Sequence, residues 1–160
     1  MRALAIALAF VAIACAPWAP PTMHTEYQYS LVRLPDSVAP GDTIQLEWRA
    51  TGRDVPGTRP TEAVARVCVA LTGPYDDVAG AKASARDPRT CPVTVPGTVA
   101  STGAMQVDLL LGAPALQTLI VPTTLAPGFY NMWNVLAYGS SDNGNSTSGA
   151  GIIQVVPRQR

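Results

Sequence analysis

Three cysteines and a few acidic side chains are the residues of this chain whose types and spacing suit chemistry. Cys15 closes a short apolar run at the N-terminus, whereas Cys68 and Cys91 lie in the middle of the chain. Cysteine thiols in such settings accept lipids, form disulfides or bind metals. The single histidine, His24, does not form the close ligand pairs that zinc sites use, so the cysteines point away from a metal site.

Two groups of acidic and amide side chains have the oxygen atoms that calcium prefers. Neither group has the spacing of an EF-hand or its terminal glutamate, and both compositions are typical of solvated turns. A Gly-x-Ser-x-Gly elbow, a phosphate loop and a histidine–glutamate metal motif are all missing from the sequence. We therefore expect no catalytic residues, no metal and no cofactor. The two groups are Asp76-Asp77 with Asp87, and Asp142-Asn143-Gly144-Asn145.

The N-terminus reads as an export signal. After Arg2, residues 3–14 are almost wholly apolar, but they are fewer than the roughly 20 residues that a transmembrane helix needs. The motif Ala12-Ile13-Ala14-Cys15 resembles a bacterial lipobox, with alanine in place of the preferred leucine. We expect a signal peptide at residues 1–14 and a lipid on Cys15, which would anchor the protein to the membrane outside the cytoplasm as a cell-envelope lipoprotein. Plain secretion after cleavage at the same bond stays open as the alternative, as does an uncleaved anchor.

Residues 15–24 are expected to form a linker between this anchor and the folded domain. Pro17, Pro20 and Pro21 fix φ and remove backbone donors, which favours an extended spacer. Trp18 would rest either at the lipid headgroups or against the base of the domain. His24, at the end of this linker, is expected to be solvated.

With Cys15 assigned to lipid, Cys68 and Cys91 remain as a pair in an oxidising compartment, where a disulfide is the default expectation. Such a bridge would contribute about 3 kcal/mol in the chain-entropy model. The alternative is two buried free thiols.

The composition excludes some classes of partner. The chain has 11 basic and 11 acidic residues and a formal net charge of +0, and like charges do not form runs. Nucleic acid and anionic membrane surfaces attract proteins through clustered basic charge, so we expect no nucleic-acid partner and membrane contact through the lipid anchor alone. The 15 prolines and 13 glycines disfavour long helices.

Period-two alternation gives the clearest structural signals. Ile44, Leu46 and Trp48 alternate with polar residues, which predicts a half-buried strand at residues 44–50. In residues 63–71 one face is apolar and Cys68 lies on the other. Residues 129–138 are apolar on both faces, which predicts a central, covered strand. Further strands are expected at residues 27–34, 93–95, 105–111, 116–121 and 151–156, and loops at 52–62, 72–89 and 139–150.

These strands predict one all-β domain at residues 25–157, an antiparallel β-sandwich of about seven to nine strands, followed by a short tail at residues 158–160. Two motifs resemble those of bacterial immunoglobulin-like and fibronectin type III-like domains: Pro40-Gly41-Asp42-Thr43 before an early strand, and Leu125-x-Pro127-Gly128-x-Tyr130 before a late one. The resemblance implies an immunoglobulin-like sandwich in which Tyr130 forms a corner, its hydroxyl bonding to backbone a few residues upstream. It also implies that Trp48 belongs to the core. The family's disulfide between early and late strands has no counterpart here.

The leading functional hypothesis is a non-enzymatic, extracytoplasmic module that acts as a structural or protein-binding accessory subunit of a cell-envelope assembly, with a protein partner. The alternative is a carbohydrate- or ligand-binding domain that uses the loop at residues 139–150, because serine and asparagine suit adaptable hydrogen bonding. Exposed tryptophans would favour this alternative, and buried Trp48 and Trp133 would weaken it. The candidate binding residues are Tyr138, Ser140, Ser141, Asp142, Asn143 and Asn145.

Overall fold

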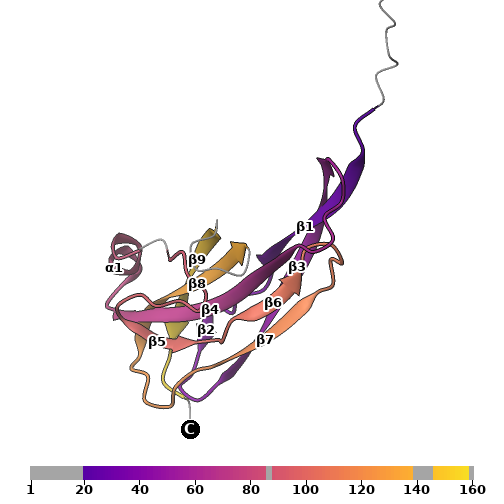
Figure 1. Cartoon of the computed structure of the whole chain (residues 1–160). Helices are drawn as coiled ribbons and strands as arrows, with labels where there is room; N and C mark the ends of the chain where they lie inside the picture. The colour runs from indigo at the N-terminus through magenta and orange to yellow at the C-terminus, as the bar shows by residue number, and fades with distance from the viewer. Residues whose placement is uncertain (1–19, 86–87, 139–145, 159–160) are drawn as a thin grey trace, which may run out of the picture.

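The computed structural model describes residues 20–85, 88–138 and 146–158, and in these residues the protein is all-β with one short helix (Figure 1). The expected signal peptide at residues 1–14 and Cys15 lie outside the described residues. Within them, the helix falls short of the length and apolar character that crossing a membrane requires. The elements in chain order are β1 (Met23–Leu31), β2 (Ser37–Val38), β3 (Thr43–Pro56), β4 (Val64–Tyr75), α1 (Val78–Ala83), β5 (Thr98–Ser101), β6 (Met105–Asp108), β7 (Ala115–Ile120), β8 (Gly128–Tyr138) and β9 (Ser146–Val155).

The strands form two sheets. One has three strands in the order β1-β3-β7, and the other has six, with β2-β9-β8-β4-β5 in a row and β6 also paired with β4. The pairings are antiparallel, as expected, except the short one between β2 and β9, which is parallel. Parallel strands need a long connection, and here the whole chain between β2 and β9 supplies it, because β2 lies near the N-terminal end of the domain and β9 near its C-terminal end.

The main core lies between the two sheets. Side chains of β3 and β7 pack against those of β4 and β8, and both Leu46 and Trp48 are completely buried. The alternation read from residues 44–50 is therefore confirmed. The face predicted for residues 63–71 is confirmed as well, because Ala65, Val67 and Val69 belong to this core while Cys68 lies on the other side of the sheet.

A second, smaller apolar cluster covers the outer face of the six-stranded sheet. Cys68 and Val135 contact Cys91 and Val93, which arrive from the segment after α1. The Cys68–Cys91 disulfide joins this segment to β4, with a Cα–Cα distance of 5.8 Å that is ordinary for such bridges. Strand β8 is thus buried on both faces between β4 and β9, as its sequence predicts.

The region at residues 72–89 is more regular than its composition suggested. Strand β4 continues to Tyr75, and Asp77 then caps helix α1 by accepting a hydrogen bond from the backbone N–H of Gly80 at 2.6 Å. The helix is held to β8 because the Asn131 side-chain amide donates to the carbonyl of Ala81 at 2.8 Å. In contrast, the strand expected at residues 93–95 is wrong, since these residues form no ladder and pack against the outer sheet face instead.

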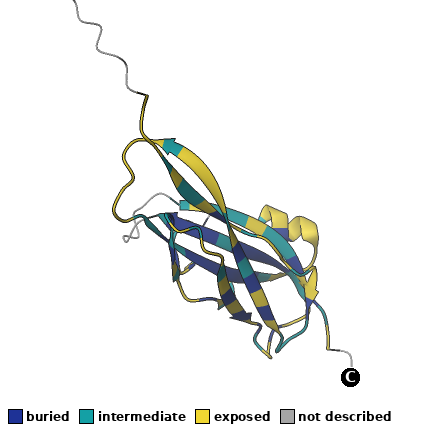
Figure 2. Cartoon of the chain, turned by 90° about the vertical axis from the view of Figure 1, so that its right-hand side faces the viewer, coloured by how far each residue is buried: buried dark blue, intermediate teal, exposed yellow. Residues whose placement is uncertain are grey.

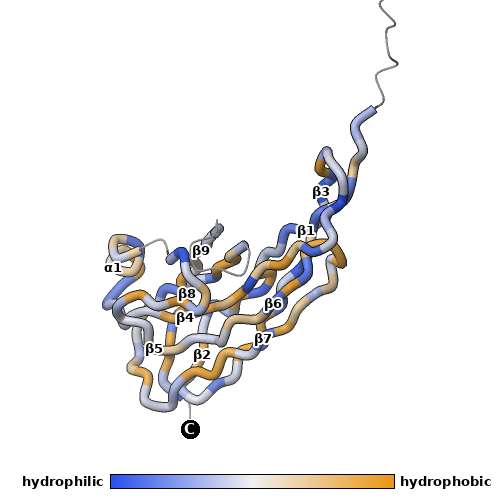
Figure 3. The backbone as a smooth tube through the Cα atoms, viewed as in Figure 1, coloured by the Kyte–Doolittle hydropathy of each residue, from blue (hydrophilic) through white to orange (hydrophobic). Residues whose placement is uncertain are grey.

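Strands β1 and β3 continue beyond the sandwich as a two-stranded arm (Figure 1). The register runs from Leu31 opposite Trp48 in the body to Met23 opposite Pro56 at the tip. Most of the arm is exposed and hydrophilic (Figures 2 and 3). Much of the loop expected at residues 52–62 is therefore strand, and β1 begins two residues inside the expected linker. The alternation signal stopped at Ala50 because both faces of the arm meet water, so no apolar period marks it.

Candidate functional site

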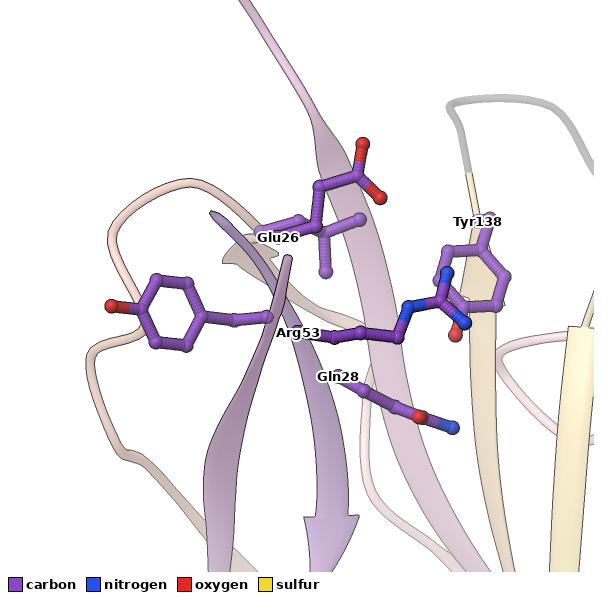
Figure 4. Close-up of a pocket in the computed structure, with 6 residues that line it drawn as sticks. Glu26, Gln28, Arg53 and Tyr138 are labelled. Atoms are coloured by element: carbon purple, nitrogen blue, oxygen red, sulfur yellow. The ribbon is translucent and has the colours of Figure 1, made fainter. Parts of the chain in front are cut away.

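A small pocket lies at the base of the arm, between the arm and the end of β8 (Figure 4). Its volume is about 170 Å³, enough for one small molecule or a single side chain. The residues that line it are Glu26, Tyr27 and Gln28 of β1, Arg53 of β3, Leu109 after β6 and Tyr138 of β8.

The arm register positions the polar side chains of this pocket. Glu26 stands opposite Arg53 in the β1–β3 ladder, and Gln28 follows two residues later on the same strand face. The backbone N–H of Tyr27 donates to the carbonyl of Leu109 at 2.8 Å, which ties the arm to the chain after β6. Tyr138 is the last residue of β8 and is half-buried.

His24 supports one wall of the pocket. Its Nε2 lies 3.0 Å from Oε1 of Glu26, and its Nδ1 lies 3.1 Å from the carbonyl oxygen of Gly57. Both partners are acceptors, so only an imidazole protonated on both nitrogens makes both bonds at once. The side chain is 8% exposed, which makes the expectation of a solvated linker histidine wrong. Pairing of β1 with β3 brings the ring against the end of β3, where Gly57 follows.

The pocket offers recognition chemistry. Arg53 supplies planar donors, Glu26 and Gln28 supply acceptors and an amide, and Tyr138 supplies a ring face and a hydroxyl. Within the described residues, groups of three or more histidine, cysteine, aspartate or glutamate side chains placed to hold a metal ion are absent. Asp77 is occupied as a helix cap, while Asp87 and Asp142 lie outside the described residues.

Of the binding residues proposed from sequence, Tyr138 is the one that lies within the described residues. Tyr138 lines the pocket, whereas Ser140, Ser141, Asp142, Asn143 and Asn145 lie outside the described residues. Sequence reasoning missed three of these residues: Gln28 lies in the segment read as an early strand, Glu26 lies just before that segment, and Arg53 lies in a segment read as a loop. Only the strand register, which the sequence does not reveal, brings them together with Tyr138.

Both tryptophans expected to report on carbohydrate binding are buried. Trp48 is inaccessible in the main core, and Trp133 is 5% exposed with its Nε1 donating to the hydroxyl of Thr72 at 3.0 Å. An exposed aromatic platform is thus not formed by these two side chains, which weakens the carbohydrate hypothesis. Tyr130 is also buried, and its hydroxyl donates to the carbonyl of Ala126 at 2.8 Å, which is the bond implied by the resemblance.

A second surface feature is the outer edge of β7, which ends the three-stranded sheet. Val121, just after β7, directs its backbone toward β3, because its N–H donates to Asp42 and its carbonyl accepts from Gly41. Alternation along an antiparallel strand then turns the backbone groups of Leu116, Thr118 and Ile120 away from β3. Within the described residues no strand is paired with these backbone groups, although β5 of the other sheet approaches β7.

The same edge carries exposed apolar side chains. Leu116 and Ile120 are each 68% exposed, although most large apolar side chains of the sandwich are buried. Strand β7 has no charged residue and no proline, the usual devices that stop strand edges from pairing with other chains. An edge of this kind is suited to accept a further strand.

Comparisons with known proteins add little. No family model and no curated protein matches the chain. Among solved structures, the chain is similar to the sporulation control protein Spo0M from Bacillus subtilis, with 14% sequence identity and a TM-score of 0.39. The match covers 84% of this chain and 50% of that one, so the chain spans half the length of the structure it matches.

Proposed function

We propose that this protein is a non-enzymatic structural module that contributes a protein-binding β-sandwich to an assembly in the cell envelope. The observation that carries the proposal is the open edge of β7, where unpaired backbone groups coincide with exposed Leu116 and Ile120. Strand addition at such an edge gives affinity through main-chain hydrogen bonds and specificity through alternate side chains.

The proposed immunoglobulin-like topology of the sandwich supports this role. In that proposal the sheet orders β1-β3-β7 and β9-β8-β4-β5 stand for the A-B-E and G-F-C-C′ orders of immunoglobulin domains, and the bond from the Tyr130 hydroxyl to the carbonyl of Ala126 stands for the tyrosine corner. In constant-type domains a strand D pairs with strand E. Here the equivalent position beside β7 is open within the described residues, so the proposed binding edge is the place of a strand that this domain does not supply.

Part of the other large face is covered by the protein itself. The outer face of the six-stranded sheet lies under α1 and the segment joined to β4 by the Cys68–Cys91 disulfide. A partner therefore meets the three-stranded sheet and its β7 edge, where the surface is accessible.

The proposed location is outside the cytoplasm, with a lipid on Cys15 and residues 15–22 as the spacer that leads to β1. The disulfide is compatible with an extracytoplasmic location, because such bridges persist in oxidising compartments. The anchor places the domain at a surface, where a structural module meets the other subunits of its assembly.

Site-specific photo-crosslinking tests the proposal. Thr118, in the middle of the open edge, is replaced by p-benzoylphenylalanine in cells that produce the protein, and crosslinked peptides are identified by mass spectrometry. We expect crosslinks to an extended protein segment. The same amino acid at Thr58, an exposed residue at the far end of the arm, is the control. Crosslinks from position 118 that match those from position 58, or none, would refute the proposal.

A second candidate function is ligand binding in the pocket at the base of the arm, supported by the approach of Tyr138 to Glu26 and Arg53. Isothermal titration with neutral and acidic oligosaccharides tests it. Binding that disappears in Arg53→Ala but persists in Arg49→Ala, an exposed arginine nearer the body of β3, would support the pocket. Equal binding by both variants, or no binding, would exclude it.

A further inference from the structure

We infer that the strand received by the edge of β7 is the β7 strand of a second copy of this chain. The inference rests on the proposed function, since it uses the same edge, and it goes further by naming the partner. Two copies would join through an antiparallel pair of β7 strands related by a twofold axis, which would merge two three-stranded sheets into one sheet of six.

The backbone satisfies the first requirement of such a pair. Leu116, Thr118 and Ile120 direct their N–H and C=O groups outward, while Gln117 and Leu119 face β3 in the sheet. A twofold axis through Thr118 places Thr118 opposite its own counterpart and Leu116 opposite Ile120 of the other copy. All three outward residues then stand in hydrogen-bonded pairs, and no outward group of the strand is left without a partner.

The side chains satisfy the second requirement. Opposed residues of an antiparallel pair place their side chains on the same face, so Leu116 meets Ile120 of the other copy on each side of the axis. Shifting the register by two residues would place an apolar side chain opposite Thr118 instead. The symmetric register is thus the one in which both exposed apolar side chains of each copy find apolar neighbours.

Charge favours self-pairing as well. A twofold axis brings like charges together when a strand is charged, and directly opposed like charges destabilise a pair. The sequence of β7, Ala-Leu-Gln-Thr-Leu-Ile, contains no charged residue. The closest charged side chains of the sheet, Glu47 and Arg49, lie on β3, one strand back from the proposed interface. The paired β7 strands themselves therefore contribute no like-charge repulsion.

The shape of the molecule allows the contact. The arm of β1 and β3 extends beyond the Ala115 end of β7, because Ala115 pairs with Trp48 and the arm lies further along β3. Figure 1 shows this arm on one copy, and in an antiparallel pair of β7 strands the arms of the two copies would point in opposite directions. Each arm would then lie beyond the end of its own β7 rather than across the shared edge.

The size of the contact sets the expected affinity. A six-residue strand pair buries less than the roughly 1,200 Å² of a standard stable interface, so we expect a weak dimer that forms reversibly with rising concentration. Tethering of both copies to one membrane would raise their effective concentration and favour pairing.

Disulfide trapping tests the register directly. The full chain is produced by export with Cys15→Ser, so that a cysteine placed at position 118 has no other free thiol to meet, and the purified protein is oxidised. Thr118→Cys is expected to form a covalent dimer, because residues in a hydrogen-bonded antiparallel pair lie about 5.5 Å apart at Cα, within disulfide range. Gln45→Cys is the matched control, because Gln45 lies opposite Thr118 on the adjacent strand β3. In the proposed dimer the two copies of Gln45 would be separated by two more strands than the two copies of Thr118. It is expected to remain a monomer.

Sedimentation velocity over a range of concentrations gives the second readout. The chain without added cysteine is expected to dimerise, and Ile120→Lys to weaken the dimer by at least about tenfold. Ile120 is exposed, so this variant leaves the core unchanged. Equal crosslinking by Thr118→Cys and Gln45→Cys would overturn the inference. So would a chain that stays monomeric up to about 1 mM, the dissociation constant that corresponds to an association free energy of about 4 kcal/mol.

These results separate the inference from the proposed function. A monomeric chain that photo-crosslinks from position 118 to a different protein overturns the second-copy inference and leaves the protein-binding function standing. A chain that neither dimerises nor crosslinks from position 118 loses both.

Discussion

Replacing Gln117 by leucine tests how the two sheets are held together. Gln117 is a buried polar side chain of β7 that reaches across the core. Its Oε1 accepts a hydrogen bond from Nε1 of Trp48 at 2.9 Å, and its Nε2 donates to the carbonyls of Val67 at 3.1 Å and Gly103 at 2.9 Å. One side chain therefore connects β3, β4 and the chain between β5 and β6.

The magnitude follows from these three bonds. Gln117→Leu leaves the indole N–H of Trp48 without its partner in a fully buried position, which costs about 1–3 kcal/mol. The two bonds donated by Nε2 contribute about 0.5–1.5 kcal/mol each. Leucine recovers about 1–2 kcal/mol through the burial of its apolar surface. The balance of these contributions runs from about 0 to about 5 kcal/mol, and we expect the free energy of unfolding to fall by its midpoint, about 2.5 kcal/mol.

Urea denaturation followed by far-ultraviolet circular dichroism measures this change, with the disulfide intact in all samples. Gln45→Leu is the matched control, because Gln45 is an exposed glutamine on the adjacent strand, and it is expected to shift stability by less than about 0.5 kcal/mol. Hydrogen exchange of the Trp48 indole N–H, monitored by NMR, is expected to accelerate in Gln117→Leu only. A loss in Gln117→Leu that equals the loss in Gln45→Leu would refute the assignment of the network as a tie between sheets.

Three further predictions concern the disulfide, the tyrosine corner and the turn before β3. Cys91→Ser is expected to lower the free energy of unfolding by about 3 kcal/mol, measured by urea denaturation. It is also expected to expose the outer face of β8, measured by protease sensitivity after α1, and unchanged cleavage would contradict this. Tyr130→Phe is expected to cost about 1 kcal/mol through loss of the bond to Ala126. Burial raises the pKa of the Tyr130 phenol, so the contribution of this group to stability is present below the ordinary tyrosine pKa and is lost as pH rises through the folded pKa. Tyr130→Phe should therefore reduce the loss of stability at alkaline pH. The backbone N–H of Ala39, and after it the Arg158 guanidinium, hold the pKa of the Asp42 carboxyl below its ordinary value, so stability is lost as pH falls through the folded pKa. Asp42→Asn should remove that dependence, and an unchanged loss of stability at acid pH in this variant would contradict the prediction.

Local patterns were sufficient for much of the fold. The apolar alternation at residues 44–50 and 63–71 predicted buried faces that the sandwich contains, including the placement of Cys68 away from the main core. Strand alternation is a property of the chain itself, because successive side chains point to opposite faces. The even pair of cysteines predicted the disulfide on similarly local grounds.

Elements without an apolar period escaped prediction. The arm of β1 and β3 is held by backbone pairing between wet strands, so its composition resembles a linker and a loop. Helix α1 is six residues long, and its apolar contact with the sheet comes through buried Ala81 rather than through a helical stripe. The segment at residues 93–95 had the apolar composition of a strand but covers a sheet face instead.

The sequence by itself determined the class of this protein: an all-β domain with an internal disulfide and a central strand buried on both faces. These features follow from side-chain type and spacing along the chain. Only the tertiary structure decided which strands are neighbours, and hence that Glu26 and Arg53 meet Tyr138 and that β7 ends a sheet with its edge open. Strand neighbours are set by packing between residues distant in sequence, and no local pattern encodes which edge is left without a partner.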